Sequence, residues 1–294
     1  MSFNESRVQD QRLWVIDSDM SSVNLEIQVI APNRGITHDQ IEDIVLIHGM
    51  GSASTAWQLL IPPLRQHFRI ITVDLPGHGK TPYRDGMAMD PVSLADMVNQ
   101  SVSKVSNSFH VVGNSLGGWI ALELAAHFGE RVRTLTALAP AGMWINPFQR
   151  RYPATAFLRM FAKSTRIFTP LFLHFEWARS LGFSTVSPRW REFSYRLAMD
   201  AVRAMTDSTG YYPAFNGMLM KRFESEIPDS IPVTIIFGDS DNTLPARSCQ
   251  ERSLAPDHAR WVTLAETGHA PMWDSVNEVM AELLAITGKK NGYQ

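Results

Sequence analysis

Short apolar runs alternate with amphipathic stretches along much of this chain. The apolar runs are typical of strands buried on both faces of a parallel sheet, and they lie at 44–47, 68–73, 109–112, 132–139, 233–237 and 261–264. Apolar side chains at helical spacing predict helices at 54–67, 93–105, 119–127, 245–254 and 276–286. The alternation predicts βαβ units and therefore an α/β fold with a mostly parallel sheet.

The chain begins differently, with two short strand patterns at Trp14–Asp17 and Val23–Ile30. Polar and apolar residues alternate in the second, from Leu25 to Val29. Such alternation indicates a strand with one exposed face. We expect a half-exposed antiparallel pair before the parallel sheet.

The strand–helix rhythm stops at Trp144 and resumes at Val233. Residues 144–220 are helical in pattern and rich in aromatic side chains, and prolines at 153, 170, 188 and 213 should divide them into short helices. Additional core helices would have the same apolar content, but the interruption favours an insertion. We therefore predict a core formed by 1–143 and 221–294, with a helical cap at 144–220.

The composition is that of an ordinary soluble protein: 294 residues, 45% hydrophobic and 19% charged. A formal net charge of −2 without a Lys/Arg run argues against a nucleic-acid partner. The single cysteine, Cys249, cannot form an internal disulfide, and no Cys/His spacing suggests a metal site. A polar start without a secretory signal and the lack of an uninterrupted apolar span predict no membrane span and a cytoplasmic location.

The most informative stretch is Gly113-Asn114-Ser115-Leu116-Gly117, which follows one predicted strand and precedes a helix. Glycines at both ends of this G-x-S-x-G pattern allow strand and helix to approach closely across a sharp turn. Such a turn exposes the hydroxyl of Ser115, as in a nucleophile elbow. A tight turn containing an unreactive serine would have similar residues, so the rest of the chain must decide between the two.

A nucleophilic serine needs a base and an acid that orients the base, and both can be sought after predicted strands. His269, one of nine histidines, stands between a strand end and a helix start, within Gly268-His269-Ala270-Pro271. Asp239 and Asp241 follow the preceding strand and could instead form a simple turn before the helix. The order Ser115, Asp241, His269 is that expected of an α/β-hydrolase. The backbone N–H groups of Met50 and Leu116 are the candidate oxyanion donors.

The chain resembles the α/β-hydrolase superfamily along nearly its whole length. The resemblance rests on five stretches in the expected order: 48–51, 74–79, 113–118, 238–241 and 268–271. It implies an eight-stranded sheet with a helical cap inserted after the sixth strand, and it makes Asp241 the triad acid. It also implies that Asp74 and His78 shape a loop beside the site. Serine at the elbow argues against the branches that use aspartate there, the dehalogenases and epoxide hydrolases.

What the resemblance implies is hydrolysis of a small to medium apolar carboxylic ester by Ser115, His269 and Asp241, without a metal or organic cofactor. We expect apolar residues of the cap to line the substrate pocket, namely Phe157, Phe161, Phe172 and Trp177. Four nearby cations should face water, although one turned inward would favour an acidic substrate: Arg159, Lys163, Arg166 and Arg179.

Two other functions stay open. Asn114 resembles the residue of the branch that hydrolyses carbon–carbon bonds in ring-cleavage diketones, whereas Ala270 after the histidine and the loop at 48–52 do not fit that branch. Thioesters and amides would use the same machinery. A hydrolase-like protein that only binds a ligand is the second class, because a fold does not settle function. Turnover of p-nitrophenyl esters would separate the enzymes from the binding protein.

Overall fold

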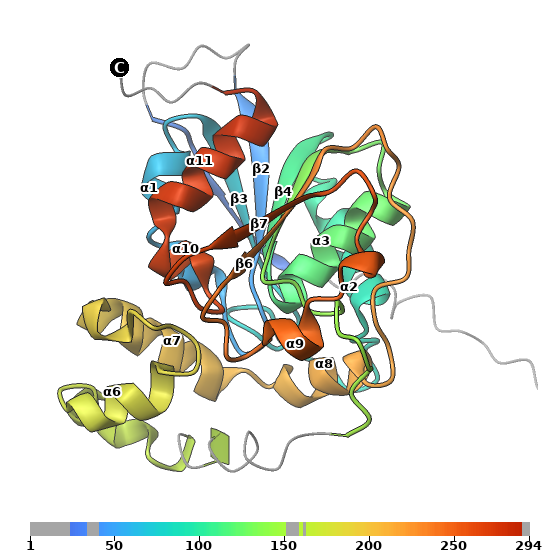
Figure 1. Cartoon of the computed structure of the whole chain (residues 1–294). Coiled ribbons are helices and arrows are strands. Elements are labelled where there is room, and N and C mark those ends of the chain that lie inside the picture. The colour runs from blue at the N-terminus through green and yellow to red at the C-terminus, as the bar shows by residue number, and fades with distance from the viewer. Residues whose placement is uncertain (1–23, 34–40, 151–158, 161–162, 290–294) are drawn as a thin grey trace, which may run out of the picture.

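A twisted, mostly parallel sheet forms the centre of the molecule, which we describe from a computed structural model (Figure 1). The structure describes residues 24–33, 41–150, 159–160 and 163–289. Within them the strands are β1 (Glu26–Ile30), β2 (Glu42–Ile47), β3 (Phe68–Asp74), β4 (Phe109–Asn114), β5 (Val132–Leu138), β6 (Val233–Gly238) and β7 (Arg260–Leu264). Their order across the sheet is β1-β3-β2-β4-β5-β6-β7.

The predicted fold class is confirmed, and the sheet has seven strands in the described part of the chain rather than the eight that the resemblance implies. β1 is the exposed antiparallel strand, and its partner is β3, with Glu26 opposite Asp74. The predicted strand Trp14–Asp17 lies outside the described residues. The strands from β2 to β7 pair in parallel, so their carboxyl ends meet at one edge of the sheet.

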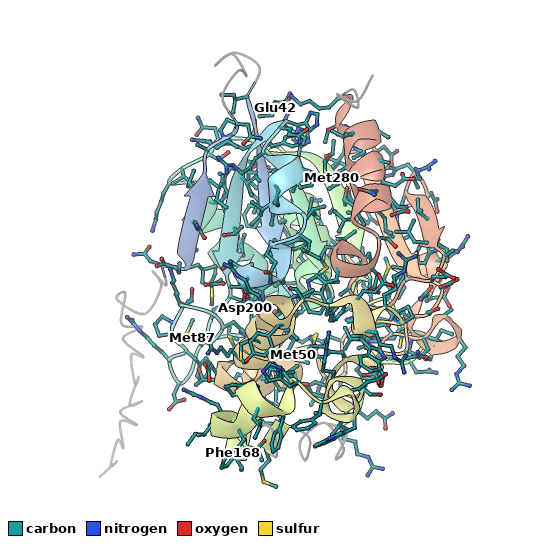
Figure 2. All side chains as sticks on the ribbon, turned by 90° about the vertical axis from the view of Figure 1, so that its left-hand side faces the viewer. Glu42, Met50, Met87, Phe168, Asp200 and Met280 are labelled. Atoms are coloured by element: carbon teal, nitrogen blue, oxygen red, sulfur yellow. The ribbon has the colours of Figure 1, made fainter. Side chains whose placement is uncertain are left out.

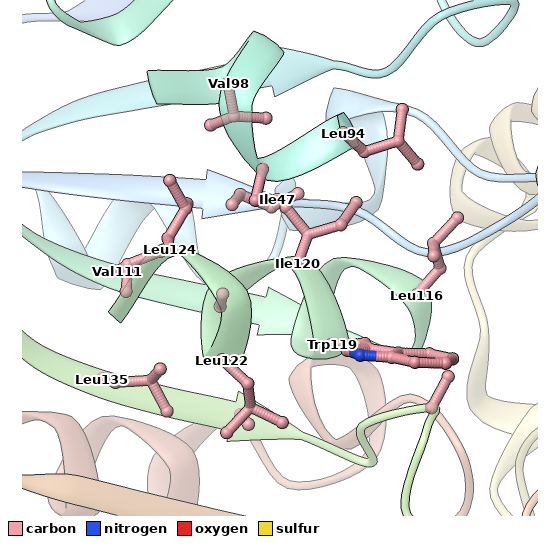
Figure 3. Packing of buried hydrophobic residues seen from close by; sticks show 14 of the residues in the cluster. Ile47, Leu94, Val98, Val111, Leu116, Trp119, Ile120, Leu122, Leu124 and Leu135 are labelled. Atoms are coloured by element: carbon pink, nitrogen blue, oxygen red, sulfur yellow. The ribbon is translucent and has the colours of Figure 1, made fainter. Parts of the chain in front are cut away.

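Helices cover both faces of the sheet. Alternate residues of β2 point to opposite sides: Val45 and Ile47 belong to one buried cluster, and Ile44 and Leu46 to another. The first cluster is completed by α2 (Pro91–Val102) and α3 (Leu116–His127), with α3 packed directly on the central strands (Figure 3). α1 (Ile61–Leu64) and α11 (Val276–Thr287) contribute to the second cluster. Strands buried on both faces explain the uninterrupted apolar runs.

Two predicted helices are shorter than their patterns suggest. The stretch 54–67 forms the 3₁₀ turn η2 (Ser54–Trp57) and then α1, which begins with Pro62 and Pro63 in its first turn. Proline has no N–H and cannot continue a preceding helix. The stretch 245–254 likewise divides into α9 (Ala246–Cys249) and η5 (Arg252–Leu254). A short helix before α11, α10 (Pro271–Asp274), was not predicted.

A helical region is inserted between β5 and β6, at the end of the sheet where the parallel strands finish (Figure 1). Its described elements are η3 (Arg166–Phe168), α5 (Thr169–Phe172), α6 (Glu176–Phe183), η4 (Trp190–Glu192), α7 (Tyr195–Asp207) and α8 (Tyr211–Met218). Pro170 and Pro213 lie in the first turns of α5 and α8 instead of between helices. First-turn N–H groups have no intrahelical acceptor, so proline is tolerated there.

The insertion has a small core of its own but is not separate from the sheet. Trp190, Phe193 and Leu197 are buried together within it. Phe215 and Met218 of α8 pack instead into the cluster on the α3 face of the sheet. The boundaries at 143 and 221 therefore stay a prediction. None of the helices described here is long and apolar enough to cross a lipid bilayer.

Candidate active site

Ser115 stands at a strained turn between β4 and α3. Its backbone has φ 56° and ψ −118°, a region that residues with a Cβ atom rarely occupy. A Cβ on Gly113 would lie 2.0 Å from the carbonyl oxygen of Gly117, and a Cβ on Gly117 would lie 2.1 Å from that of Ile47. Both glycines are thus required by the close approach of strand and helix. The turn places Ser115 at the edge of the sheet where β4 ends.

Three side chains from separate loops form one hydrogen-bonded line at this edge. His269 Nε2 lies 2.9 Å from Ser115 Oγ, and His269 Nδ1 lies 2.9 Å from Asp241 Oδ2. An ionised carboxylate can only accept, so Nδ1 carries the proton and Nε2 is left to accept from the serine hydroxyl. His269 Nε2 therefore lies within proton-transfer distance of Ser115 Oγ and is the acceptor when the ring carries its one proton on Nδ1.

The environment of Asp241 keeps its carboxyl group ionised. Burial raises its pKa, but His269 and the N–H groups of Leu244 and Thr243 together outweigh burial and lower it. Those N–H groups donate to Oδ1 at 2.8 and 2.9 Å, which leaves Oδ2 for the histidine. Asp239, the other candidate, is exposed and accepts from the Ser240 hydroxyl. The structure therefore brings Asp241, not Asp239, to His269.

The two expected oxyanion donors flank the serine. Leu116 is the first residue of α3, where a backbone N–H has no acceptor within the helix. Met50 follows Gly49, and a Cβ on Gly49 would lie 3.0 Å from the Cβ of Ser115, so this loop lies against the nucleophile. Figure 2 shows Met50 beyond the end of the sheet, among the inserted helices. In the described part of the chain neither N–H donates a hydrogen bond.

This arrangement agrees with the comparisons with known proteins. The profile of the Alpha/beta hydrolase family matches residues 44–283, which is most of the chain. The chain belongs to the alpha/beta hydrolase family. Among curated relatives of this alpha/beta hydrolase, a pimeloyl-[acyl-carrier protein] methyl ester esterase of Vibrio vulnificus (strain YJ016) is 23% identical over 259 residues, covering 86% of this chain and 97% of that protein.

Solved structures show the same fold. The enol-lactonase from Burkholderia xenovorans LB400 superposes with a TM-score of 0.66 at 17% identity, covering 90% of this chain and 96% of that one. A meta-cleavage product hydrolase from Pseudomonas fluorescens IP01 gives a TM-score of 0.65 at 18% identity, covering 90% and 94%. At these identities the likeness extends to the architecture and not to the reaction.

Asn114 has a structural role in this alpha/beta hydrolase. Its Nδ2 donates to the backbone oxygen of Leu138 at 3.1 Å and to that of His269 at 3.0 Å. The side chain thus joins the elbow to the loop that carries the base. This bridge explains why asparagine stands at the elbow, and the explanation is the same for an ester and for a carbon–carbon bond in the substrate.

The histidine and aspartate beside the oxyanion loop are structural as well. His48 is fully buried; it donates from Nδ1 to Gly49 O and accepts at Nε2 from the Leu75 N–H. Asp74 accepts from the N–H groups of Ser54 and Lys80. Burial, aided by the nearby His48, lowers the pKa of His78 to about 3. These groups hold loops in place, as the resemblance implies.

A second support for His269 comes from the insertion and was not predicted from the sequence. The carbonyl oxygen of Val186 accepts from the His269 N–H at 2.7 Å. Asp274 accepts from the Gly268 N–H at 2.8 Å and from the Ser187 hydroxyl. Burial is the main cause of the raised pKa of Asp274. An acidic residue in the short helix directly after His269 is the only sequence signal that could have pointed to this support.

We expect Asp274→Asn to lower kcat about tenfold with little change in KM. An amide offers one acceptor where the carboxylate offers two, so either Gly268 N–H or the Ser187 hydroxyl loses its partner at a cost of about 1–3 kcal/mol. Ser187→Ala is the matched control, because it keeps the bond to Gly268 and should have the smaller effect on kcat. Steady-state kinetics with thermal unfolding would test this, and equal effects of the two substitutions on kcat would refute it.

Two of the four predicted pocket residues can be located in the described part of the chain. Phe157 and Phe161 lie outside the described residues. Phe172 is half-buried and Trp177 is 59% exposed, with their rings 5.9 Å apart on the insertion. Helical spacing shows which residues share a face but not which face turns to the site. The exposure of Trp177 argues against a place in a closed pocket.

Other side chains of the insertion lie over the oxyanion loop. A Cβ on Gly51 would lie 2.7 Å from Met205 Sδ and 2.9 Å from a ring carbon of Tyr211. Met205 belongs to α7 and Tyr211 to α8, so these two helices lie against the loop that carries Met50. Met205 and Tyr211 are therefore better candidates for contact with a substrate than Phe172 and Trp177. Their spacing in the sequence does not distinguish them from the other apolar residues of the insertion.

Of the four cations near the predicted pocket, two are turned inward. The Arg159 guanidinium donates to Met205 O and Ser208 O and lies over the Tyr211 ring, 4.8 Å from its centroid. Arg179 donates to the carbonyl oxygens of Trp190 and Phe193. Both are half-buried and engaged by backbone oxygens at helix and turn ends. Lys163 and Arg166 are exposed, as expected.

Proposed function

We propose that this protein is a serine hydrolase that cleaves a carboxylic ester through an acyl-enzyme. The observation that carries the proposal is the continuous line Ser115–His269–Asp241, with 2.9 Å at each contact. A serine hydroxyl is a weak nucleophile at neutral pH and needs both partners. A hydrolase needs Ser115 at a strained turn, because the turn presents its hydroxyl to His269. A protein that only binds a ligand would have no such reason to keep the strained backbone of Ser115.

The proposed reaction has two halves. Ser115 Oγ attacks the acyl carbon while its proton passes to His269 Nε2, and the N–H groups of Met50 and Leu116 hold the oxyanion. The alcohol leaves with the proton from Nε2, which produces the acyl-enzyme. Water then gives a proton to His269 and attacks the acyl carbon, and the acid is released as Ser115 regains its proton. Asp241 stays ionised throughout and stabilises the imidazolium.

The ester is favoured over other bonds by the curated relatives. The V. vulnificus relative acts on a methyl ester, and nearly its full length aligns with this chain. The carbon–carbon alternative rested on Asn114, whose bonds to Leu138 and His269 would serve an ester hydrolase equally well, so this residue does not favour that alternative. An ester hydrolase is therefore the function that the site supports best.

We expect the substrate to be a small to medium apolar ester. Met205 and Tyr211 are the side chains of the insertion that lie over the oxyanion loop, and the inward-turned Arg159 is already engaged by backbone oxygens. A substrate carboxylate placed there would lose its hydration, and the engaged Arg159 is not free to replace it. Each CH₂ group of the substrate that is buried there gains about 0.8 kcal/mol of binding free energy.

A chain-length series of neutral p-nitrophenyl esters should show turnover, with kcat/KM rising by roughly tenfold for two added carbons until the site is full. Matched dicarboxylic half-esters are the control for charge, and they should be poorer substrates. A preference for the half-esters would overturn the apolar site. Absence of turnover across the whole series, with Ser115 unreactive toward acylating reagents, would overturn the hydrolase.

Activity should fall on acidification, and one group should be responsible. Protonation of His269 Nε2 removes the acceptor for the serine proton. The lowered pKa of Asp241 keeps that carboxylate charged as the pH falls, so it does not contribute to the loss until stronger acid. A kcat/KM profile measured from about pH 8 to about pH 5 should decline with a single protonation. A flat profile over that range would contradict His269 as the base.

A further inference from the structure

Charge is divided unevenly between the two parts of the chain. Residues 144–220 contain ten Arg and Lys residues but four Asp and Glu residues, a net charge of +6. The remaining residues therefore carry −8, because the whole chain is at −2. The basic part is also the part that projects from one end of the sheet (Figure 1). The insertion thus carries a net positive charge even though Arg166, Arg191 and Arg196 pair with acidic side chains within it, and the rest of the chain carries a net negative charge.

The same end carries a patch of exposed apolar side chains, which we call the outer patch. It lies on η3, α5 and α6 and the residues beside them, and its members are Met160, Ile167, Phe168, Leu171, Phe175, Trp177 and Leu181. Ile167 is 86% exposed and Met160 is 60% exposed. Figure 2 shows Phe168 at the opposite end of the molecule from Glu42, beyond Met50 and the active-site loop. A cluster of this kind marks an interaction surface, since single exposed apolar residues are ordinary but contiguous ones are not.

Aromatic contacts make the outer patch continuous. The ring of Phe172 lies 6.2 Å from that of Phe168 and 5.9 Å from that of Trp177, and Phe175 stacks on Trp177 at 6.5 Å. The same insertion carries the exposed cations Lys163, Arg196 and Arg203, of which Arg196 pairs with Asp200 on α7. Bulky apolar and aromatic side chains with Lys and Arg beside them are typical of helices that lie in a membrane interface.

We propose that the outer patch docks this protein on the surface of an anionic phospholipid bilayer. Phe168, Leu171 and their neighbours would enter the boundary between headgroups and acyl chains, and the surrounding cations would remain at the level of the phosphates. The charge of the two parts fixes the orientation, because the membrane attracts the insertion and repels the core. The active-site edge of the sheet would then face the bilayer across the insertion.

The charge and shape of the outer patch favour a lipid surface over a folded protein partner. Phe168, which is 56% exposed, lies at the end of the molecule, and a deformable bilayer accepts such exposed side chains without a matching cavity. Its basic surroundings disfavour a second copy of this chain as the occupant, because two insertions of +6 would be brought together. An acidic protein would satisfy the charge but would leave side chains such as Ile167 in need of a complementary pocket.

Sedimentation with unilamellar vesicles tests the proposal. The full-length protein should bind vesicles of phosphatidylglycerol mixed with phosphatidylcholine and bind much less to phosphatidylcholine alone, with binding weakened by salt. Phe168→Ser combined with Leu171→Ser should lower the partition coefficient at least tenfold. Lys163→Gln should lower it about fivefold, since each cation near such a surface contributes by that order.

Two matched controls isolate the outer patch. Val92, an exposed apolar residue on α2, is changed to serine, and Arg84, an exposed cation of the core, is changed to glutamine; both variants should bind as the parent does. Thermal unfolding of every variant checks the fold. The readout needs no turnover, so Ser115→Ala protein should bind equally well, and docking is tested separately from the proposed function.

Three results would overturn the proposal. The first is no binding to the anionic vesicles, or binding that the paired substitution at Phe168 and Leu171 leaves unchanged. The second is a dimer in sedimentation velocity that the same substitution dissociates while vesicles are not bound, which would assign the outer patch to a second copy. The third is patch-dependent binding to an acidic carrier protein without binding to vesicles.

Discussion

Replacing Ser115 with alanine is expected to lower kcat for a p-nitrophenyl ester by roughly 10⁴-fold or more while the protein still folds. The hydroxyl is the only atom lost, and it is the atom that His269 Nε2 contacts at 2.9 Å. Alanine keeps the Cβ and therefore the same backbone strain at φ 56°, so the turn between β4 and α3 should be preserved.

The measurement is a comparison of steady-state kinetics with thermal unfolding for the two proteins. A large loss of kcat with a nearly unchanged unfolding temperature is the expected pair of results. Turnover close to that of the parent would show that another group attacks the ester. If the alanine variant lost both activity and folding, Ser115→Cys would serve as the second test. This variant keeps a nucleophile at the same turn and should retain weak turnover.

The second large effect is expected at Asp241, where asparagine should lower kcat by roughly 10⁴-fold. The Asn amide can donate to Nδ1, which stabilises the tautomer with the proton on Nε2, and that tautomer cannot accept from Ser115. The charge that stabilises the imidazolium is lost at the same time. The Asp241 carboxylate is buried and contacts His269 at 2.9 Å, and among the described residues no second carboxylate contacts that ring.

Asp239→Asn is the control, because it makes the same chemical change two residues away. Asp239 is exposed, and its contacts are with Ser240 and the backbone of Thr267 rather than with His269. We expect kcat to change by less than about threefold in this variant. A larger loss for Asp239→Asn than for Asp241→Asn, in folded proteins, would mean that the acid of the triad has been assigned to the wrong residue.

The parts of the fold that depend on burial could be predicted from the sequence. Strands β2 to β6 are buried on both faces or nearly so, and their apolar runs stand out from the surrounding helices. β7 lies at the edge of the sheet and is partly exposed, so the burial expected for its apolar run was wrong. The approach of Ser115, Asp241 and His269 followed from the strand ends, because parallel strands place their following loops at one edge. Asp241 could be preferred to Asp239 only through the resemblance, since both follow the same strand.

The insertion was harder to predict, for a physical reason. Its residues are apolar on faces that pack inside the insertion, as Trp190 and Phe193 do, and also on faces that are exposed, as Ile167 and Trp177 are. A spacing of apolar residues does not distinguish these faces without the position of the neighbouring elements. The same limit applies to Asp274 and Ser187, whose contact joins segments that are far apart in the chain.

A fluorophosphonate probe gives the most direct test of the claim that Ser115 is the nucleophile activated by His269 and Asp241. The probe phosphonylates a serine only where a base removes the hydroxyl proton and donors hold the oxyanion. Mass spectrometry of the intact protein should show one adduct per chain, and peptide analysis should place it on Ser115. Asp241→Asn protein should react far more slowly, and Asp239→Asn protein should react as the parent does. An adduct on another residue, or no adduct at all in folded protein, would contradict the account.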